Sequence, residues 1–215
     1  MDAFEIPRLR GVTHAYAFWG ALVAAAVLIV LTPGGMPRAS AAIYGAGLCA
    51  LFGGSALYHR WRWNPRWRPI LRRIDHSTIF VFIAASYTPV GLLILSGTTK
   101  WVVMITVWAG ALCGVALSVA WITAPRALCA ACYVALGWVA VVAFPQMAAS
   151  LPVAPLVLII VGGVLYTAGA VIFALGRPNP WPRVFGFHEI FHVFVILAAV
   201  VHFVAISGWV VMHNA

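Results

Sequence analysis

Charged residues are scarce in this sequence. Of its 215 residues, 8% are Asp, Glu, Lys or Arg, whereas an ordinary soluble domain carries about 25%. Apolar residues make up 64%, so too few charges remain to coat a water-soluble core. Cysteine is also rare, with four in the chain, all in or beside apolar stretches. These scarcities exclude a soluble globule, a disordered chain and a disulfide-based secreted module, and they indicate a multi-pass membrane protein.

Acidic residues and lysine are the scarcest charges of all. Four acids stand against thirteen cations, which gives a formal net charge of +9, and arginine outnumbers lysine twelve to one. Six of the arginines fall between Arg60 and Arg73. A basic chain can indicate nucleic-acid binding, but cations gathered between apolar runs are typical of cytoplasmic loops. We therefore interpret the charge as a signal of membrane topology and expect no nucleic-acid partner.

Long apolar runs, in contrast, are abundant. A helix needs about 20 apolar residues to cross a bilayer, and seven runs come close to that length: Ala15–Thr32, Ala39–Tyr58, Ser77–Ser96, Trp101–Thr123, Ala127–Pro145, Val153–Leu175 and Ile190–Met212. Their separators are short and rich in Pro and Gly, so the helices should pack in sequence and antiparallel. The sequence predicts an all-α fold, with one seven-helix transmembrane domain over residues 1–215.

The distribution of cations predicts how this bundle sits in the membrane. With seven spans, eleven cations fall on the side of the N-terminus, and Arg38 and Lys100 fall on the other side. Positive loops stay in the cytoplasm. We therefore expect a cytoplasmic N-terminus and an outside C-terminus, in a cell membrane that is the inner membrane of a bacterium.

Three local patterns indicate packing rather than chemistry. Gly110-x-x-x-Gly114 is typical of close helix contacts, and Pro89 predicts a kink inside the third helix. Cys129-x-x-Cys132 lacks a second ligand pair and is a weak metal signal. We interpret these cysteines as small apolar filler.

Ionisable residues inside membrane spans are costly, so each indicates a functional site. His59 ends the second helix, Asp75 begins the third, and His188 and His192 begin the seventh, all at the same side of the membrane. His188 and His192 are four residues apart, so their side chains differ by about 40° and about 6 Å along a helix. Both can face one metal ion, as helical zinc ligands do.

A third ligand, His59, would complete an open zinc site of the catalytic type. Asp75 would orient or deprotonate the attacking water. Ser55, one turn before His59 on the same face, would hydrogen-bond the ligands as a supporting residue. A metal that only ties the helices together is the structural alternative.

The other histidines fit this site less well. His202 is ten residues beyond His192, about 15 Å deeper and about 80° around the helix, so we expect a buried hydrogen-bonding histidine there. His14 and His213 lie at membrane boundaries and suggest no special role. His76 points about 100° away from Asp75, which favours interface packing.

A second interpretation comes from His188-Glu189-Ile190-Phe191-His192, which matches the H-E-x-x-H signature of zinc proteases. There Glu189 would be the general base of an intramembrane metalloprotease. On a helix Glu189 lies about 100° from His188, so it would alternatively face a neighbouring helix or the basic loops.

Four segments together resemble the hemolysin III proteins, the bacterial branch of the progestin and adipoQ receptor superfamily, which includes the adiponectin receptors. They are 55–59 (SALYH), 73–80 (RIDHSTIF), 86–89 (SYTP) and 188–194 (HEIFHVF). The resemblance covers essentially the whole chain. It implies seven helices, an N-terminus inside and zinc held by residues matching His59, His188 and His192.

In that family an aspartate matching Asp75 lies beside the metal, and a serine matches Ser55. The family pattern gives Glu189 no role. The resemblance implies zinc-dependent hydrolysis of lipid amides such as ceramide, as in the animal receptors, or a part in bacterial membrane-lipid homeostasis.

From these residues we expect a zinc-dependent membrane hydrolase of lipid-like amides or esters. Its partners would be membrane lipids, with anionic headgroups at the arginine-rich loop. The alternatives are a non-catalytic zinc-containing sensor or regulator of membrane state, a hemolysin that forms pores, and the protease.

Overall fold

In the computed structural model, the described part of the chain, residues 7–212, is helical throughout except for its connections and one isolated bridge between Trp181 and Phe185. The elements are α1 (Val12–Leu31), α2 (Met36–Arg60), α3 (Arg68–Leu93), α4 (Gly97–Ala120), α5 (Arg126–Gly137), α6 (Ala140–Ser150), α7 (Val153–Leu175), α8 (Phe187–Ala205) and a π-helical end, η1 (Ile206–Val211). Asp2, Glu5 and His213 lie outside the described residues.

Seven of these spans are long and apolar enough to cross a bilayer, with α5 and α6 forming one span and α8 and η1 another. The predicted all-α seven-helix architecture is therefore confirmed. Apolar side chains such as Trp19, Val30, Ile105 and Leu112 are exposed along the outer faces of the helices. So much exposed apolar surface suits lipid rather than water, and the protein is a multi-pass membrane protein.

The third helix starts earlier than predicted, at Arg68 instead of Ser77. Pro69 occupies its first turn, where proline is favoured because the amide there has no partner within the helix. The first two turns are rich in arginine and therefore lie outside the apolar run. Asp75 consequently lies inside this helix rather than at its beginning.

The fifth span also differs, because it is broken between Gly137 and Ala140. The phenol of Tyr87, from α3, fills the break: its hydroxyl donates to the Gly137 carbonyl and accepts from the Ala140 amide. A side chain inserted into the backbone ladder is a recognised cause of a kink. The long-range partner explains why the break was not predicted from the local sequence.

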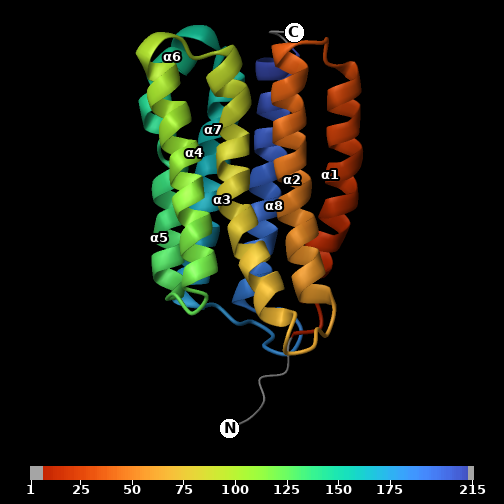
Figure 1. The fold of residues 1–215 in the computed structure, drawn as a ribbon. Helices are drawn as coiled ribbons and strands as arrows, with labels where there is room; N and C mark the ends of the chain where they lie inside the picture. Colours follow the sequence, from red (N-terminus) through yellow and green to blue (C-terminus); the bar gives the residue numbers. More distant parts are fainter. Residues whose placement is uncertain (1–6, 213–215) are drawn as a thin grey trace.

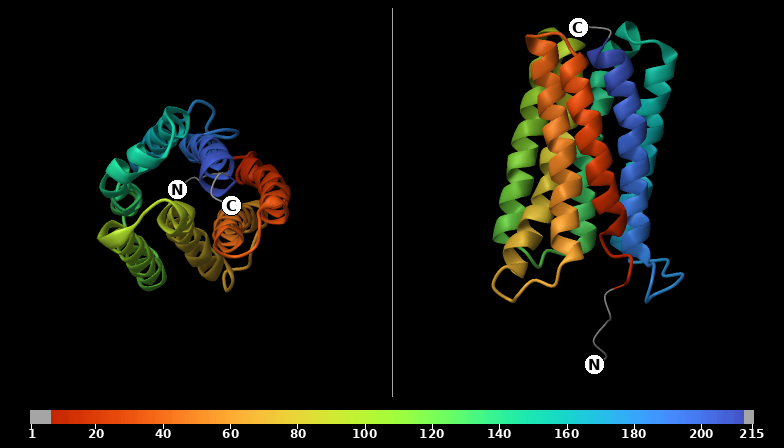
Figure 2. Two further views of the ribbon diagram at one scale, coloured as in Figure 1. Left: turned by 90° about the horizontal axis from the view of Figure 1, so that it is seen from above. Right: turned by 90° about the vertical axis from the view of Figure 1, so that its right-hand side faces the viewer.

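Seen along the bundle axis, the helices form a ring (Figure 2). Consecutive helices pack side by side from α1 to α4, α5 packs against α7 and α3, and α8 closes the ring by packing against both α7 and α1. The predicted sequential packing is thus observed. The first and last helices become neighbours, so residues near the two ends of the sequence meet.

The bundle has two chemically different ends. Residues 7–11, 61–67, 121–125 and 176–186 lie together at one end, at the bottom of Figure 1. We call this the arginine-rich end. Arg38 and Lys100 lie at the opposite end, in the first turns of α2 and α4. The structure thus segregates the cations as predicted, while the membrane side to which each end faces stays a prediction.

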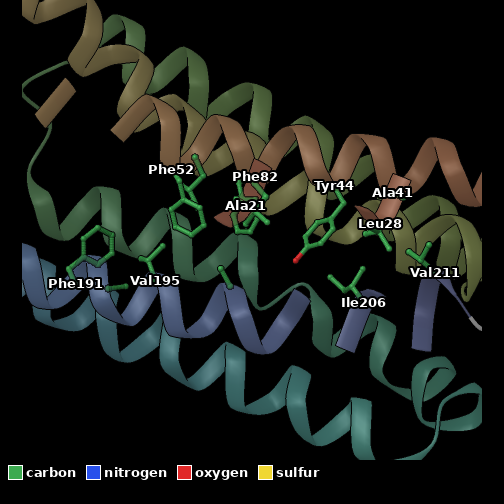
Figure 3. Close-up of a cluster of buried hydrophobic side chains, with 14 of the residues drawn as sticks. Ala21, Leu28, Ala41, Tyr44, Phe52, Phe82, Phe191, Val195, Ile206 and Val211 are labelled. Atoms are coloured by element: carbon green, nitrogen blue, oxygen red, sulfur yellow. The ribbon is translucent and has the colours of Figure 1, made fainter. Parts of the chain in front are cut away.

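A buried apolar seam joins α1, α2, α3 and α8, with Tyr44, Phe52, Phe82 and Val195 along it (Figure 3). Small residues allow close helix contacts there: a Cβ added at Gly47 would lie 2.6 Å from the Cβ of Ala85. Such contacts are the usual device for packing helices in lipid.

The predicted packing role of the Gly110-x-x-x-Gly114 pair is confirmed, because Cβ atoms at these positions would lie 2.6 and 2.3 Å from Leu136 and Phe80. Pro89 is accommodated within α3, which continues to Leu93. Cys129 and Cys132 are free thiols on α5.

Candidate metal centre

Three histidines converge inside the arginine-rich end of the bundle. His59 is in the last turn of α2, and His188 and His192 are in the first two turns of α8. One ring nitrogen from each lies within 4.8 Å of the other two. The Nε2 atoms of His59 and His188 are 3.3 Å apart. This triad, which the sequence predicted, could hold a metal ion.

Asp75 brings a carboxylate to the triad from α3. Its Oδ2 lies 3.5 Å from His59 Nε2, and the residue is buried. The same oxygen is 3.7 Å from Nδ1 of His76. The predicted depth of Asp75 is therefore observed. His76 lies nearer than its helical angle suggested, and its Nδ1 donates to the Arg72 carbonyl at 2.8 Å.

His14 belongs to the same site, and the expectation of an ordinary boundary histidine was wrong. It is 2% exposed and its ring stacks on His192, with 3.8 Å between centroids and 6° between planes. His14 is in the first turn of α1, at the same end of the bundle as the other histidines. The missing information was that α1 and α8 are neighbours.

Ser55 is buried beside this pair of rings. Its Oγ lies 2.8 Å from Nδ1 of His14. Ser55 was expected to support the metal ligands directly, but its hydrogen bond reaches them only through His14, which stacks on His192. The serine therefore belongs to the surroundings of the triad.

An apolar cavity of about 550 Å³ runs from this cluster through the middle of the bundle and reaches Val90 and Ile206. Its polar end includes His14, Ser55, Asp75 and His192, and its walls come from α3, α5, α6, α7 and α8. Almost all of the remaining lining is aliphatic or aromatic. Such a space suits an apolar ligand with one polar group at the histidines.

A family model described as "Haemolysin-III related" matches residues 3–203, which include every residue of the cluster. The chain belongs to the haemolysin-III related family. The resemblance drawn from four short segments of sequence is thereby confirmed over most of the chain.

Curated relatives of this haemolysin-III related protein occur in bacteria and animals. The Hemolysin-3 homolog of Bacillus subtilis (strain 168) is 32% identical over 154 residues, covering 72% of this chain and 69% of the relative. Hemolysin-3 of Bacillus cereus is 26% identical over 207 residues, covering 94% and 90%. Monocyte to macrophage differentiation factor of Homo sapiens is 29% identical over 205 residues, covering 90% and 80%.

In this haemolysin-III related protein, Glu189 faces away from the triad. It is 1% exposed, its Oε1 accepts from Nε of Arg10 at 2.5 Å, and its Oε2 accepts from the Gly186 amide at 2.8 Å. Both carboxylate oxygens are engaged, so Glu189 pairs with the basic N-terminal segment and caps α8. This arrangement gives no support to a general base in the H-E-x-x-H sense.

His202 lies apart from the triad, as predicted. Its Nε2 donates to the Ile159 carbonyl at 3.0 Å, so the expected hydrogen bond is present. The side chain is half-buried rather than buried, because it forms part of the cavity wall. Gly162 makes room for it: a Cβ there would lie 2.1 Å from the His202 ring.

Proposed function

We propose that this protein is a zinc-dependent membrane hydrolase of lipid-like amides or esters. The observation that carries the proposal is the position of the histidine triad and Asp75 at the polar end of an apolar cavity of about 550 Å³. A soluble substrate would gain nothing from such a cavity. A lipid could place its acyl chain there and its carbonyl at the histidines.

The donor set fits zinc. Zinc–nitrogen bonds of about 2.0–2.1 Å in a tetrahedral site place two ligand nitrogens about 3.3 Å apart, and the Nε2 atoms of His59 and His188 are separated by 3.3 Å. Nδ1 of His192 is buried without a hydrogen-bond partner in the described part of the chain. Hydrogen bonding through this atom therefore does not explain why the ring lies here. Three imidazoles beside an open position are typical of catalytic zinc.

When bound, zinc supplies a Lewis acid that polarises a carbonyl and acidifies water. In the described part of the chain, Asp75 is the carboxylate that contacts the triad, and its Oδ2 is within 4 Å of His59 and His76. We assign it the role of accepting a proton from the attacking water and returning it to the leaving group. The surrounding apolar side chains exclude other water from the bond that is cleaved.

His14 and Ser55 hold the other side of the site. The His14 ring fixes the plane of His192 by stacking on it, and the Ser55 hydroxyl fixes the His14 ring through Nδ1. Partners of this kind orient metal-ligating histidines, and their loss typically costs about tenfold to hundredfold in metal affinity or activity. We assign both residues positioning roles.

The length of the cavity supports an acyl chain as its occupant. Ile206, on the cavity wall, is fourteen residues beyond His192, which corresponds to about 21 Å along the helix axis. One leaflet contributes half of a hydrocarbon core about 30 Å thick, so an acyl chain that spans one leaflet is shorter than the cavity. Such a chain would fit between the triad and Ile206.

The runner-up is a zinc-containing sensor without catalysis, in which the metal ties α2 to α8. The same triad would hold the metal in a sensor, so a substitution of Asp75 is needed to distinguish the two functions. Asp75→Asn should retain zinc and lose hydrolysis in an enzyme, whereas a sensor should keep its function. Sealed liposomes containing the pure protein test the pore alternative, which requires ion leakage.

Metal analysis joined to a lipid assay tests the proposal. Purified wild-type protein should carry about one zinc per chain and hydrolyse members of a panel of lipid amides and esters. His188→Ala should lose the metal and the activity. His202→Ala is the matched control, because it removes a histidine of the same helix outside the triad and should keep the metal. Full metal content after substitution of both His188 and His192 would refute the site.

We also propose that the arginine-rich end faces the cytoplasm, in the inner membrane of a bacterium. The segregation of arginines supports this orientation through the positive-inside rule. Cysteine accessibility at Arg62→Cys, labelled from either side of oriented vesicles, tests it.

A further inference from the structure

A second, smaller cavity opens on the arginine-rich end beside the triad. Its volume is about 190 Å³, and three arginines line it: Arg10, Arg72 and Arg126. The lining includes no Asp or Glu. Three guanidinium groups beside one small cavity repel one another, and an anion bound between them would relieve that repulsion.

The three arginines are brought together from separate parts of the fold. Arg10 precedes α1, Arg72 is in α3 and Arg126 begins α5. Arg10 is paired with Glu189, and the Arg126 guanidinium lies 4.9 Å from the centre of the Phe187 ring. Within the described residues, two carboxylates offset part of this charge: Glu189 pairs with Arg10, and Asp75 lies 3.5 Å from His59, which also lines the cavity. Three arginines against two carboxylates leave the cavity with a positive excess.

The two cavities meet at the metal centre. His76, Phe173 and His188 line both of them. The apolar cavity extends from these residues into the bundle, and the arginine-lined cavity extends toward the arginine-rich end. One molecule could therefore occupy both cavities only if it joined an apolar chain to an anionic group, with the linkage between them at the triad.

We propose that the arginine-lined cavity binds the phosphate-type anionic headgroup of a single-chain lipid whose acyl chain fills the apolar cavity. Planar guanidinium forks recognise phosphate oxygens through paired, charge-assisted hydrogen bonds. The cavity is of a size for one compact headgroup. The assignment of the lipid as a substrate rests on the proposed hydrolase function, whereas the binding of the headgroup does not.

Two ether lipids that cannot be hydrolysed test the proposal by binding alone. One is an alkylglycerol phosphate, and the other is the neutral alkylglycerol with the same chain. Wild-type protein in neutral nanodiscs should bind the phosphate probe at least about tenfold more tightly, since one charge-assisted contact is worth about a factor of ten. Arg72→Gln and Arg126→Gln should each remove about tenfold from that preference.

Arg62→Gln is the matched control, because it removes the same charge from an exposed residue outside both cavities. It should leave the preference unchanged, and unchanged binding of the neutral probe shows that each variant is folded. Equal affinity of the two probes for the wild-type protein would overturn the proposal. An equal loss in Arg62→Gln would also overturn it, since the effect would then come from the general surface charge.

Competition with inorganic phosphate distinguishes binding of a lipid headgroup from binding of a free phosphate ion. For a lipid headgroup, inorganic phosphate should compete only weakly, because it lacks the contacts of the chain. Inorganic phosphate that bound as tightly as the lipid phosphate would overturn the headgroup assignment. Hydrolysis of the corresponding acyl lipids is measured separately, so a failure of the hydrolase function leaves the binding result intact.

Discussion

The buried pair of Arg10 and Glu189 offers a test of how the first turn of α8 is held. The two partners differ in burial, since the side chain of Glu189 is 1% exposed and that of Arg10 is 22% exposed. Arg10→Met would leave the buried carboxylate of Glu189 without a cationic partner. Removal of one partner from a buried pair typically costs about 3–5 kcal/mol in the free energy of unfolding.

The reverse substitution should cost less. Glu189→Met removes the buried charge itself, and Arg10 is exposed enough to reach water. The remaining loss is the cap on the Gly186 amide, about 1–2 kcal/mol. The double variant should be closer to Glu189→Met than to Arg10→Met, because it leaves no buried charge.

The assay is unfolding of the purified protein in mixed micelles, followed by helical circular dichroism during titration with a denaturing detergent. The order of stability should be wild type, then Glu189→Met and the double variant, then Arg10→Met. A greater loss in Glu189→Met than in Arg10→Met would refute the reasoning. So would losses below about 1 kcal/mol in both single variants, the value of an exposed pair.

Two further predictions concern ring stacking and helix packing. His14→Phe should keep the stack on His192 and the metal, but the buried Ser55 hydroxyl loses its partner. The variant should therefore lose about 1–3 kcal/mol of stability and lower hydrolysis about tenfold to hundredfold. His14→Ala also loses the stack and should lose about 2 kcal/mol or more beyond this; metal content and detergent unfolding check both variants. Gly114→Ala should lower the free energy of unfolding by about 1–3 kcal/mol, because the new Cβ would lie 2.3 Å from the buried Phe80 ring. Gly20→Ala is the control: no atom lies within 4 Å of its Cβ, so it should cause no measurable loss of stability.

The bundle itself was predictable because a bilayer imposes a length and an apolar composition on every span. Val153–Leu175 was predicted to the residue. The beginning of α3 was missed because two turns of arginine-rich helix extend beyond the apolar run. The break at Gly137 was missed because its partner, Tyr87, is fifty residues away in the sequence.

The triad was predictable for a related reason. Helix periodicity puts His188 and His192 on one face, and the order of the spans puts His59 at the same depth. His14 was missed because depth alone does not say which helices are adjacent. That adjacency depends on the closure of the ring between α1 and α8, a property of the complete bundle.

The contacts between the beginning and the end of the chain impose an order on biosynthesis. The amides of Arg8 and Leu9 bond to the carbonyls of Arg183 and Val184 at 3.1 and 3.2 Å, and His14 stacks on a residue of the last helix. A ribosome completes those partners only after six spans have been made. The nascent protein therefore has no assembled centre while it is being inserted, and its chemistry starts only when the final helix joins the ring.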